Sequence, residues 1–351
     1  MPQAKKIFSE KILEWYSAHR RDLPWRKTKD PYKVWVSEII LQQTRVDQGL
    51  PYYKKFIKAF PSVIELANAK QQEVLRLWQG LGYYSRARNM HRCAGQVASI
   101  HQGKFPQRAE ALKKLSGIGD YTAAAISSIC FGEPSAVVDG NVYRVLSRIF
   151  GITAPINSVA GKKEFREIAD QLIPQKFPGD YNQAVMEFGA LHCTPRNPGC
   201  DHCPFSNVCI AKKQNLQDML PVKLAAAPKR ERYFHYLLLE KSGKIWMKKR
   251  DAGDIWHGLY DFLLIESDKK LNEKTLMIRM RQHFNLSGSP KLIQAFTHIL
   301  THQKLHTSFY HLIDSAEFKG TEKQTGKYFS RNEIKKLPKP VFIDKILDLL
   351  H

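Results

Sequence analysis

Four of the six cysteines lie in one short segment and could hold a metal centre. They are spaced C-x6-C-x2-C-x5-C, at Cys193, Cys200, Cys203 and Cys209. Zinc sites usually separate two C-x2-C pairs, whereas four thiolates in one tight loop suit a cubane iron–sulfur cluster. A disulfide framework would need a short secreted chain, and no apolar signal core precedes Lys5 and Lys6. The spacing predicts one 4Fe–4S cluster in the loop 193–209.

Two carboxylates could serve as the acid and the anion of a bond-cleavage reaction. Glu38 lies in an apolar run, an environment that raises a carboxyl pKa and suits a general acid. Asp139 precedes an expected helix, whose first amides should keep it ionised. Taken singly, Glu38 has the ordinary explanation of a solvated helix residue and Asp139 that of an N-cap.

Charge and a glycine-containing turn both indicate a polyanionic partner. The 351 residues carry a formal net charge of +22, a surplus that favours nucleic acid. Residues 115–122 place Gly117 and Gly119 before a helix whose free amides can face a phosphate, as in a helix–hairpin–helix DNA clamp. An interhelical turn without a ligand is the alternative. The chain lacks an apolar run of about eighteen residues, so no membrane partner is expected.

The length of the chain indicates that more than one domain positions these residues, because one core seldom holds so many. Residues 1–215 are predicted to be mostly α-helical, with helices near 33–43, 122–131, 141–150, 162–172 and 182–191. Residues 216–230 are predicted to be a linker, with its Pro- and Ala-rich part at 221–228.

Residues 231–351 are predicted to form a smaller α+β domain. Ser242 and Gly243 should turn a hairpin between its first two strands. Strands are expected near 233–239, 244–249, 261–266, 291–296 and 305–313, with helices near 273–283 and from Val341 onward.

The order of helical clamp, acid and four-cysteine loop resembles the iron–sulfur branch of the helix–hairpin–helix DNA glycosylase superfamily, over residues 10–212. Endonuclease III-type members carry a Schiff-base lysine where this chain has Tyr121, so that lyase route is closed at the expected position. Residues 23–26 (LPWR), 35–44 (WVSEIILQQT) and 80–89 (GLGYYSRARN) resemble signatures of the MutY-type adenine DNA glycosylases.

This resemblance implies a role for each acid. Glu38 would protonate the departing adenine, while Asp139 would stabilise the oxocarbenium-like sugar or bond to it transiently, as in glycoside hydrolysis. Tyr121 and Asn141 would orient Asp139 and the sugar.

The resemblance also implies contacts with DNA. Gln43 and Tyr83 would fill the gap left by the extruded base, although Tyr83 or its neighbour Tyr84 could be a core aromatic. Other positions that match the family around the adenine or the duplex are Trp25, Arg26, Leu41, Thr44 and Gln183. Phosphate contacts, or else a solvated basic face, are expected of Arg144, Arg148, Lys212 and Lys213.

Residues 245–247 and 255–262 resemble the MutT-like (Nudix-type) domain of the same family. Residues 262–285 lack the acidic helix that would hold magnesium, so this domain is expected to read the lesion rather than hydrolyse pyrophosphate. The family reads oxidised guanine with a Phe-Ser-His loop, and the matching residues are Leu300, Thr301 and His302. A second register is 296–298. The Thr301 hydroxyl can still hydrogen-bond to the base.

These observations predict a monofunctional adenine DNA glycosylase of base excision repair. Its substrate would be double-stranded DNA with adenine opposite 8-oxoguanine or guanine, bound by a monomer in a bacterial-type cytoplasm near the nucleoid. Three alternatives stay open: an endonuclease III-like glycosylase/lyase, a hydrolase of oxidised nucleotides, and a non-catalytic DNA-binding protein with a structural metal.

Overall fold

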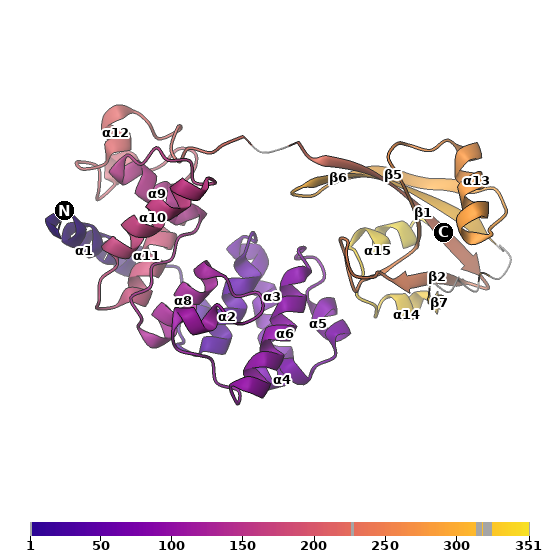
Figure 1. Ribbon diagram of the computed structural model, residues 1–351, viewed down its shortest axis with the longest axis horizontal. Helices are drawn as coiled ribbons and strands as arrows, with labels where there is room; N and C mark the ends of the chain where they lie inside the picture. The colour runs from indigo at the N-terminus through magenta and orange to yellow at the C-terminus, as the bar shows by residue number, and fades with distance from the viewer. Residues whose placement is uncertain (1, 226–227, 314–317, 319–324, 351) are drawn as a thin grey trace. The chain divides into compact units, whose positions relative to one another are not determined.

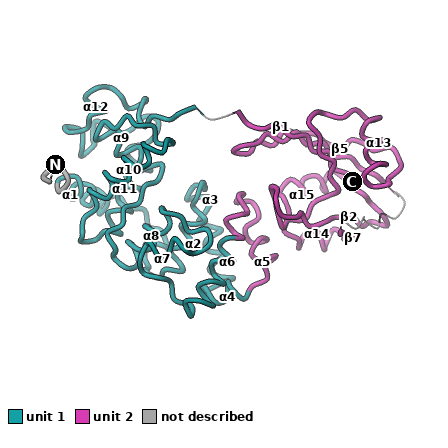
Figure 2. The backbone as a smooth tube through the Cα atoms, in the orientation of Figure 1, with its two compact units in different colours: residues 1–68, 89–225 teal, residues 69–88, 226–351 magenta. Residues whose placement is uncertain are grey.

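The computed structural model describes residues 2–225, 228–313, 318 and 325–350 (Figure 1). The chain forms two compact units (Figure 2). Unit 1 consists of residues 1–68 and 89–225, and unit 2 consists of residues 69–88 and 226–351. None of the described helices has the length and apolar character needed to cross a membrane.

The described part of unit 1 is built from helices. Its regular elements are α1 (Pro2–His19), η1 (Pro24–Arg26), α2 (Pro31–Leu41), α3 (Val46–Ala59), α4 (Val63–Asn68), α6 (Ser85–Ile100, which begins in unit 2), α7 (Ala109–Leu112), α8 (Asp120–Phe131), α9 (Gly140–Phe150), α10 (Val159–Leu172), α11 (Pro178–Leu191), η2 (Cys200–His202) and α12 (Ile210–Gln214). The five helices predicted from periodicity are confirmed as α2, α8, α9, α10 and α11.

Local sequence fixes where the helices of the site begin and end. Helix α9 starts at Asp139, whose carboxylate accepts from the amides of Asn141 and Val142, and it ends at Gly151 with a left-handed φ of 70°. Helix α8 ends in the same way at Gly132, with φ 74°. These caps fix the start of α9 and the ends of α8 and α9.

An aromatic core joins helices that lie far apart in sequence. Phe8 of α1 lies 5.1 Å from Phe205 of the cysteine loop, measured between ring centroids, and Phe188 of α11 lies 5.5 Å from Phe205. All three side chains are buried. Each buried ring contributes roughly 2–3 kcal/mol of apolar transfer free energy. This packing ties the cysteine loop to α1 and α11.

The linker prediction is wrong for residues 216–225, which pack on unit 1. Leu220 is buried in the unit 1 core. The amide of Ile156 donates to the carbonyl of Val222 at 3.0 Å, and the amide of Leu224 donates to the side chain of Asn157 at 2.9 Å. The proline and alanine content suggested an open segment because composition does not report tertiary contacts.

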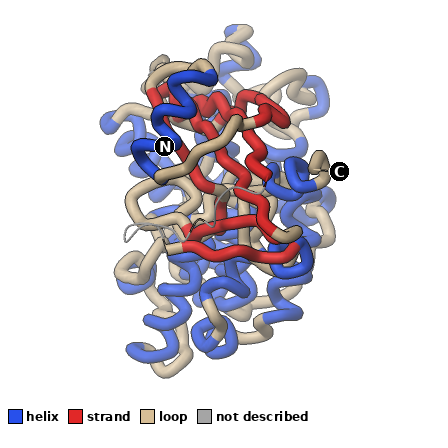
Figure 3. Tube along the Cα trace, turned by 90° about the vertical axis from the view of Figure 1, so that its right-hand side faces the viewer, coloured by secondary structure: helices blue, strands red, loops and turns tan. Residues whose placement is uncertain are grey.

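Unit 2 contains one seven-stranded mixed sheet (Figure 3). Its order is β3-β2-β1-β6-β5, with β4 paired to β1 and β7 paired to β2. Strands β1 and β6 are parallel, and the other pairs are antiparallel. The strands are β1 (Arg230–Lys241), β2 (Lys244–Lys249), β3 (Tyr260–Asp261), β4 (Leu263–Ser267), β5 (Lys291–Ile299), β6 (Gln303–Ile313) and β7 (Gly326–Ser330).

The predicted hairpin is confirmed, since Ser242 and Gly243 have φ values of 50° and 70° between β1 and β2. Two positive φ values suit the tight turn of a two-residue hairpin. The strand predicted over 261–266 is divided between β3 and β4. Strand β7 was not predicted, because five residues with only two apolar side chains give little alternation to detect.

The sheet of unit 2 is covered on both faces, as expected for a two-sided α+β core. One cluster includes Phe309 with Phe342 of α15 (Phe342–Leu347), and the other includes Leu276 and Met280 of α13 (Glu273–Phe284). The remaining helices are α5 (Gln71–Leu77) and α14 (Arg331–Ile334).

Residues 69–88 belong to unit 2 by their contacts, although the sequence places them with the other helices. The side chain of Gln72 donates to the Tyr260 hydroxyl at 2.9 Å, and Arg88 donates to the carbonyl of His257 at 2.8 Å. Helical periodicity alone could not reveal these contacts.

Candidate active site

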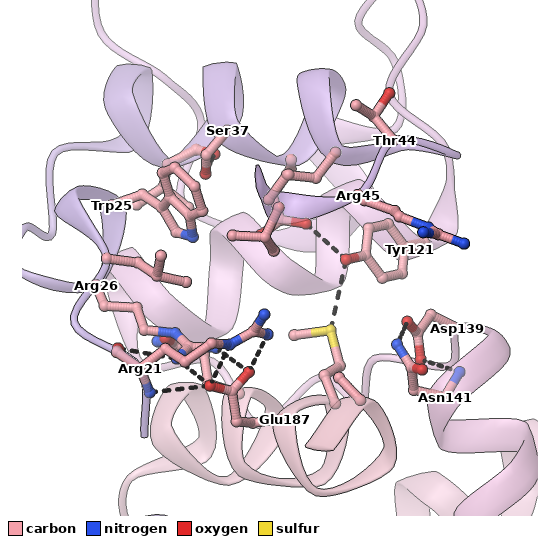
Figure 4. Close-up of a pocket in the computed structure, with 18 of the residues that line it drawn as sticks. Arg21, Trp25, Arg26, Ser37, Thr44, Arg45, Tyr121, Asp139, Asn141 and Glu187 are labelled. Atoms are coloured by element: carbon pink, nitrogen blue, oxygen red, sulfur yellow. Dashed lines mark hydrogen bonds and ion pairs between the residues drawn. The ribbon is translucent and has the colours of Figure 1, made fainter. Parts of the chain in front are cut away.

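A pocket of about 490 Å³ opens in unit 1 (Figure 4). Its walls come from η1, α2, α8, α11 and the start of α9. Nine residues predicted for the site line it: Trp25, Arg26, Glu38, Leu41, Thr44, Tyr121, Asp139, Asn141 and Gln183. Residues from five separate parts of the chain therefore meet in one cavity.

Glu38 lies on α2 and is only 7% exposed. The Tyr121 hydroxyl donates to its Oε2 at 2.6 Å. Burial raises the pKa of Glu38 to about 7; the negative charge of Asp139 adds to this shift, while the Tyr121 hydrogen bond and Arg26 oppose it. A carboxyl with such a pKa can hold a proton near neutral pH and donate it.

Asp139 has a different environment, although it faces the same pocket. Its Oδ1 accepts from the amides of Asn141 (2.9 Å) and Val142 (2.8 Å), and its Oδ2 accepts from Asn141 Nδ2 at 2.8 Å. Burial nevertheless raises the pKa of Asp139 above its usual value, against these hydrogen bonds. The amides at the start of a helix were expected to dominate the pKa of Asp139, and the sequence did not reveal that burial outweighs them.

The predicted contact of Asn141 with Asp139 is present, but that of Tyr121 is not the one predicted. Tyr121 donates to Glu38, and its hydroxyl also lies 3.4 Å from the sulfur of Met186. Of the two carboxylates, the side chain of Tyr121 therefore hydrogen-bonds to Glu38. Helical phase alone could not tell which of the two carboxylates this ring reaches.

Glu187 of α11 also lines the pocket and was not singled out from the sequence. Its side chain is 1% exposed and forms ion pairs of 2.6 Å with both Arg21 and Arg26. A signal was available, because Glu187, like Glu38, is an acid within an apolar helical stretch.

Gln43 and Tyr83, the predicted gap-filling residues, share an unusual backbone conformation. Their φ values are 56° and 45°, in the left-handed region that residues other than glycine seldom occupy. Gln43 is exposed in unit 1, and Tyr83 is 46% exposed in unit 2. The adjacent Tyr84 is buried, so Tyr84 is the core aromatic of that pair.

The proposed lesion-reading residues form the turn between β5 and β6 in unit 2. The amide of Leu300 donates to the carbonyl of Gln303 at 2.8 Å and closes the turn. The Thr301 hydroxyl hydrogen-bonds to the Tyr83 hydroxyl, and His302 lies beside it with its side chain exposed. Leu300, Thr301 and His302 all line a second pocket, of about 620 Å³, within unit 2.

The alternative register, 296–298, lies on β5 instead of in the turn. The Phe296 ring stacks on Phe309 at 5.5 Å, and the His298 ring lies 6.3 Å from that of Phe342. The side chains of Phe296 and His298 pack within unit 2, whereas Thr301 and His302 of the turn are exposed.

The turn of the predicted DNA clamp requires glycine at Gly117. Its φ is +78°, and a Cβ there would lie 2.7 Å from the Cβ of Asn89. Gly119 is the N-cap of α8, and a Cβ there would meet no atom within 4 Å. Both glycines are exposed in the turn before α8, as the predicted clamp requires.

The four cysteines of the loop are free thiols. In this structure, no group of three or more His, Cys, Asp or Glu among the described residues is placed to hold a metal ion. Burial raises the pKa of Cys203 to about 11, and the charges of the other three cysteines add to the shift. The four thiols have the donor chemistry of an iron–sulfur cluster, and their grouping around one stays a prediction.

Arg144 and Arg148 do not form a basic face, because both are buried. Arg144 donates to Asn141 Oδ1 (2.9 Å) and to the carbonyl of Cys193 (2.7 Å). Arg148 donates to Cys193 Sγ at 3.5 Å and to the carbonyl of Thr194 at 2.7 Å. These guanidinium groups hold the cysteine loop, so the phosphate prediction is wrong for both.

Of the two lysines predicted to bind phosphates, one contacts the loop. Lys212 donates to the carbonyl of Cys200 at 3.0 Å and lies 3.7 Å from Asp201. Lys213 is exposed, as a phosphate contact requires.

Two known families match the chain in successive regions. Residues 36–175 match the HhH-GPD superfamily of base excision DNA repair proteins, and residues 235–349 match the NUDIX domain. The first region contains Glu38, Tyr121 and Asp139, and the second contains the β5–β6 turn.

Curated relatives cover most of the chain. The adenine DNA glycosylase of Buchnera aphidicola subsp. Schizaphis graminum is 34% identical over 346 residues, which is 98% of each protein. The rat adenine DNA glycosylase is 44% identical over 216 residues, 59% of this chain and 42% of the rat protein.

Solved structures resemble the helical part. A thermostable thymine-DNA glycosylase superposes with a TM-score of 0.56 and 31% identity, covering 61% of this chain and 98% of that one. An endonuclease III–DNA complex gives a TM-score of 0.53 at 20% identity over 62% of this chain and 99% of that one, a likeness of fold alone.

Proposed function

The chain belongs to the adenine DNA glycosylase family, and we propose that it hydrolyses the N-glycosidic bond of adenine in double-stranded DNA during base excision repair. One observation carries this proposal: the pocket of unit 1 holds a protonatable acid, Glu38, and a second carboxylate, Asp139. Cleaving a glycosidic bond requires such a pair, because charge of opposite sign develops on the base and on the sugar.

In the proposed reaction, Glu38 donates its proton to the departing base, oriented by the hydrogen bond from Tyr121. Asp139 stabilises the oxocarbenium-like sugar, or bonds to it transiently before water attacks. Asn141 holds the carboxylate of Asp139 in place. The roles of all four residues are part of the proposal.

We propose adenine opposite 8-oxoguanine or guanine as the substrate, with unit 2 as the reader of the opposite base. The β5–β6 turn supports this role, since it presents Leu300, Thr301 and His302 beside a pocket. Nucleotide hydrolysis in unit 2 is disfavoured because three carboxylates beside its sheet already bind arginine. Asp254 and Glu266 each lie within 2.7 Å of Arg232, and Asp261 lies 3.1 Å from Arg250.

We further propose that Cys193, Cys200, Cys203 and Cys209 hold one 4Fe–4S cluster. Bound there, the cluster would cross-link the loop, and the hydrolysis itself requires no electron transfer. Arg148 supports the assignment, because its N–H groups reach both Cys193 Sγ and the neighbouring loop carbonyl. Cys200→Ser should lower iron and sulfide content and duplex affinity before it slows excision at saturating DNA.

The proposal includes a monomeric protein in a bacterial-type cytoplasm, associated with the nucleoid. The net charge of +22 supports association with DNA. Sedimentation of the purified protein would test the monomer, and cell fractionation would test the location.

The deciding experiment is excision from a duplex with adenine opposite 8-oxoguanine, compared with adenine opposite guanine and with a fully paired control. Free adenine should appear from both mispairs, and the strand should stay intact until alkali is added. A borohydride-trapped imine with direct strand scission would instead support an endonuclease III-like lyase. Binding without adenine release would support a non-catalytic DNA-binding protein.

A further inference from the structure

Glu187 is buried in the wall of the catalytic pocket, and the reaction described above does not use it. Its side chain is 1% exposed, less than Glu38 at 7%. An ionised carboxylate is costly to bury unless charged partners surround it. Its partners therefore indicate what it does.

Two arginines bind both oxygens of Glu187. Arg26 donates from Nη1 to Oε1 and from Nη2 to Oε2, both at 2.6 Å. Arg21 donates from Nε to Oε1 at 2.9 Å, from Nη2 to Oε2 at 2.6 Å and from its own amide to Oε1 at 3.0 Å. Burial alone would raise the pKa of Glu187, but these bonds outweigh it and lower the pKa to about 2. The carboxylate is therefore ionised at neutral pH.

These bonds fix the guanidinium of Arg26 in the pocket wall. Its Nη1 also donates to the carbonyl of Arg21 at 3.1 Å, and its Cζ lies 5.6 Å from the centre of the Tyr16 ring. The side chain of Arg26 is 13% exposed. A bidentate pair restricts a long side chain far more than a single contact does.

A fixed guanidinium in this wall has two chemical effects. It offers only hydrogen-bond donors, which match the acceptor ring nitrogens of adenine, whereas guanine carries a donor N–H at the corresponding edge. Its positive charge also favours the ionised form of Glu38. The charge of Glu187 offsets this second effect, because it lies between the two arginines.

This inference rests on the proposed function. We propose that Glu187 is a positioning residue for adenine excision: it fixes Arg26 and Arg21 as donors in the pocket wall and balances their charge near Glu38. Arg26 faces the extruded base, and Glu187 acts through it.

The charged surroundings of Glu38 define the expected pH effect. Tyr121 from α8, Asp139 at the start of α9 and Arg26 from η1 all act on it. The other charged groups that line the pocket are Arg21, Arg45, Asp47, Arg144 and Glu187. Removing the charge of Glu187 leaves Arg26 unbalanced, which lowers the pKa of Glu38. The decline of the excision rate with rising pH should then begin at lower pH.

The experiment measures single-turnover adenine release across pH on a saturating 8-oxoguanine duplex, together with duplex affinity. The variants are Glu187→Gln, Glu187→Asp, Arg26→Gln and the Arg26→Gln/Glu187→Gln double variant. Glu187→Gln should slow excision about tenfold to a hundredfold, with affinity changed by less than about threefold, because the donors lose their alignment. Glu187→Asp should recover part of the rate.

The double variant distinguishes positioning from a general structural role. If Glu187 acts through Arg26, the double variant should be no slower than Arg26→Gln alone. Glu133→Gln is the matched control, since Glu133 binds the amide of Ala109 outside the pocket. Its rate and pH profile should equal those of the wild type.

Additive losses in the cycle, or a Glu187→Gln variant with wild-type rate and pH profile, would overturn the role of Glu187. Should Glu187→Gln fail to fold, as judged by circular dichroism, Glu187→Asp with Arg26→Lys provides the same cycle. A wild-type protein that releases no adenine contradicts the proposed function itself. An active wild type with an indifferent Glu187 contradicts only this inference.

Discussion

The carboxylates in the pocket of unit 1 and those beside the sheet of unit 2 have different hydrogen-bond partners. In unit 2, Arg232 binds Asp254 and Glu266 at 2.7 and 2.6 Å, and Arg250 binds Asp261 at 3.1 Å. In the pocket, Glu38 receives a phenol and Asp139 receives amides. Burial raises the pKa of Glu38 to about 7, whereas the hydrogen bonds from Arg232 outweigh burial and lower the pKa of Asp254. The contrast separates an arginine-paired acid from the acid that is proposed to react.

Among the variants that test this comparison, Asp139→Asn should cause the largest loss of adenine excision. The amide can retain the cap of α9 but lacks the negative charge that the developing sugar cation needs. Adenine release in a single turnover should fall about a thousandfold, while duplex affinity stays near wild type. Asp30→Asn is a matched control, because Asp30 caps α2 through the amide of Tyr32. Equal losses in both variants would assign the effect to capping.

Glu38→Gln should lose excision activity and should be more stable than the wild type at high pH. The pKa of Glu38 is raised from 4.5 to about 7 in the folded protein, so the folded state binds its proton more tightly. Wild-type stability should therefore be lost as pH rises from about 4.5 to 7, by about 3 kcal/mol. Glu38→Gln should remove that loss, giving a higher urea midpoint at pH 8 and little change at pH 5.

A control variant shows whether that result is specific to Glu38. Glu167→Gln removes an exposed carboxylate, 3.9 Å from Lys163, and should not alter the pH dependence. A Glu38→Gln variant no more stable than wild type at pH 8 would show that Glu38 is not strained by burial.

Arg232→Met should break the structural side of the comparison. The arginine is 7% exposed, while Asp254 and Glu266 are 36% and 37% exposed, so solvent screens part of the loss. The free energy of unfolding should fall by about 2 kcal/mol, measured with urea. Lys304→Met, which removes an exposed pair with Glu231 at 3.1 Å, should change it by less than about 0.5 kcal/mol. Equal effects of the two variants would contradict a structural role for the unit 2 network.

Among these variants, Thr301→Val should have the smallest effect. It removes the hydroxyl that contacts Tyr83 and that is proposed to read the opposite base. The preference for 8-oxoguanine over guanine should fall about threefold to tenfold, since one hydrogen bond contributes about 1 kcal/mol. Competition between the two duplexes measures it. Thr297→Val, on β5, should leave the preference unchanged. An unaltered preference in Thr301→Val would remove this residue from the reading site.

Sequence reasoning located elements and reactive side chains better than it assigned charged partners. Apolar periodicity predicts α2 and α8, and the acid in an apolar run identifies Glu38, because both signals are local. Arg144 and Arg148 were misjudged since a basic residue looks alike whether it meets phosphate or buried carbonyls. Glu187 was missed for a related reason: its arginines lie more than 160 residues away in the chain. Such pairs exist only in the folded structure.

The left-handed backbones of Gln43 and Tyr83 have a consequence for how quickly the protein can search DNA. Both residues have these backbone conformations, with φ values of 56° and 45°, in the protein without DNA. A backbone that already has the geometry needed for binding loses less conformational entropy at each encounter. A repair protein must test very many intact base pairs for each damaged one. With the gap-filling role that the family resemblance implies for Gln43 and Tyr83, this prearrangement would shorten each test and favour a fast rejection of undamaged sites.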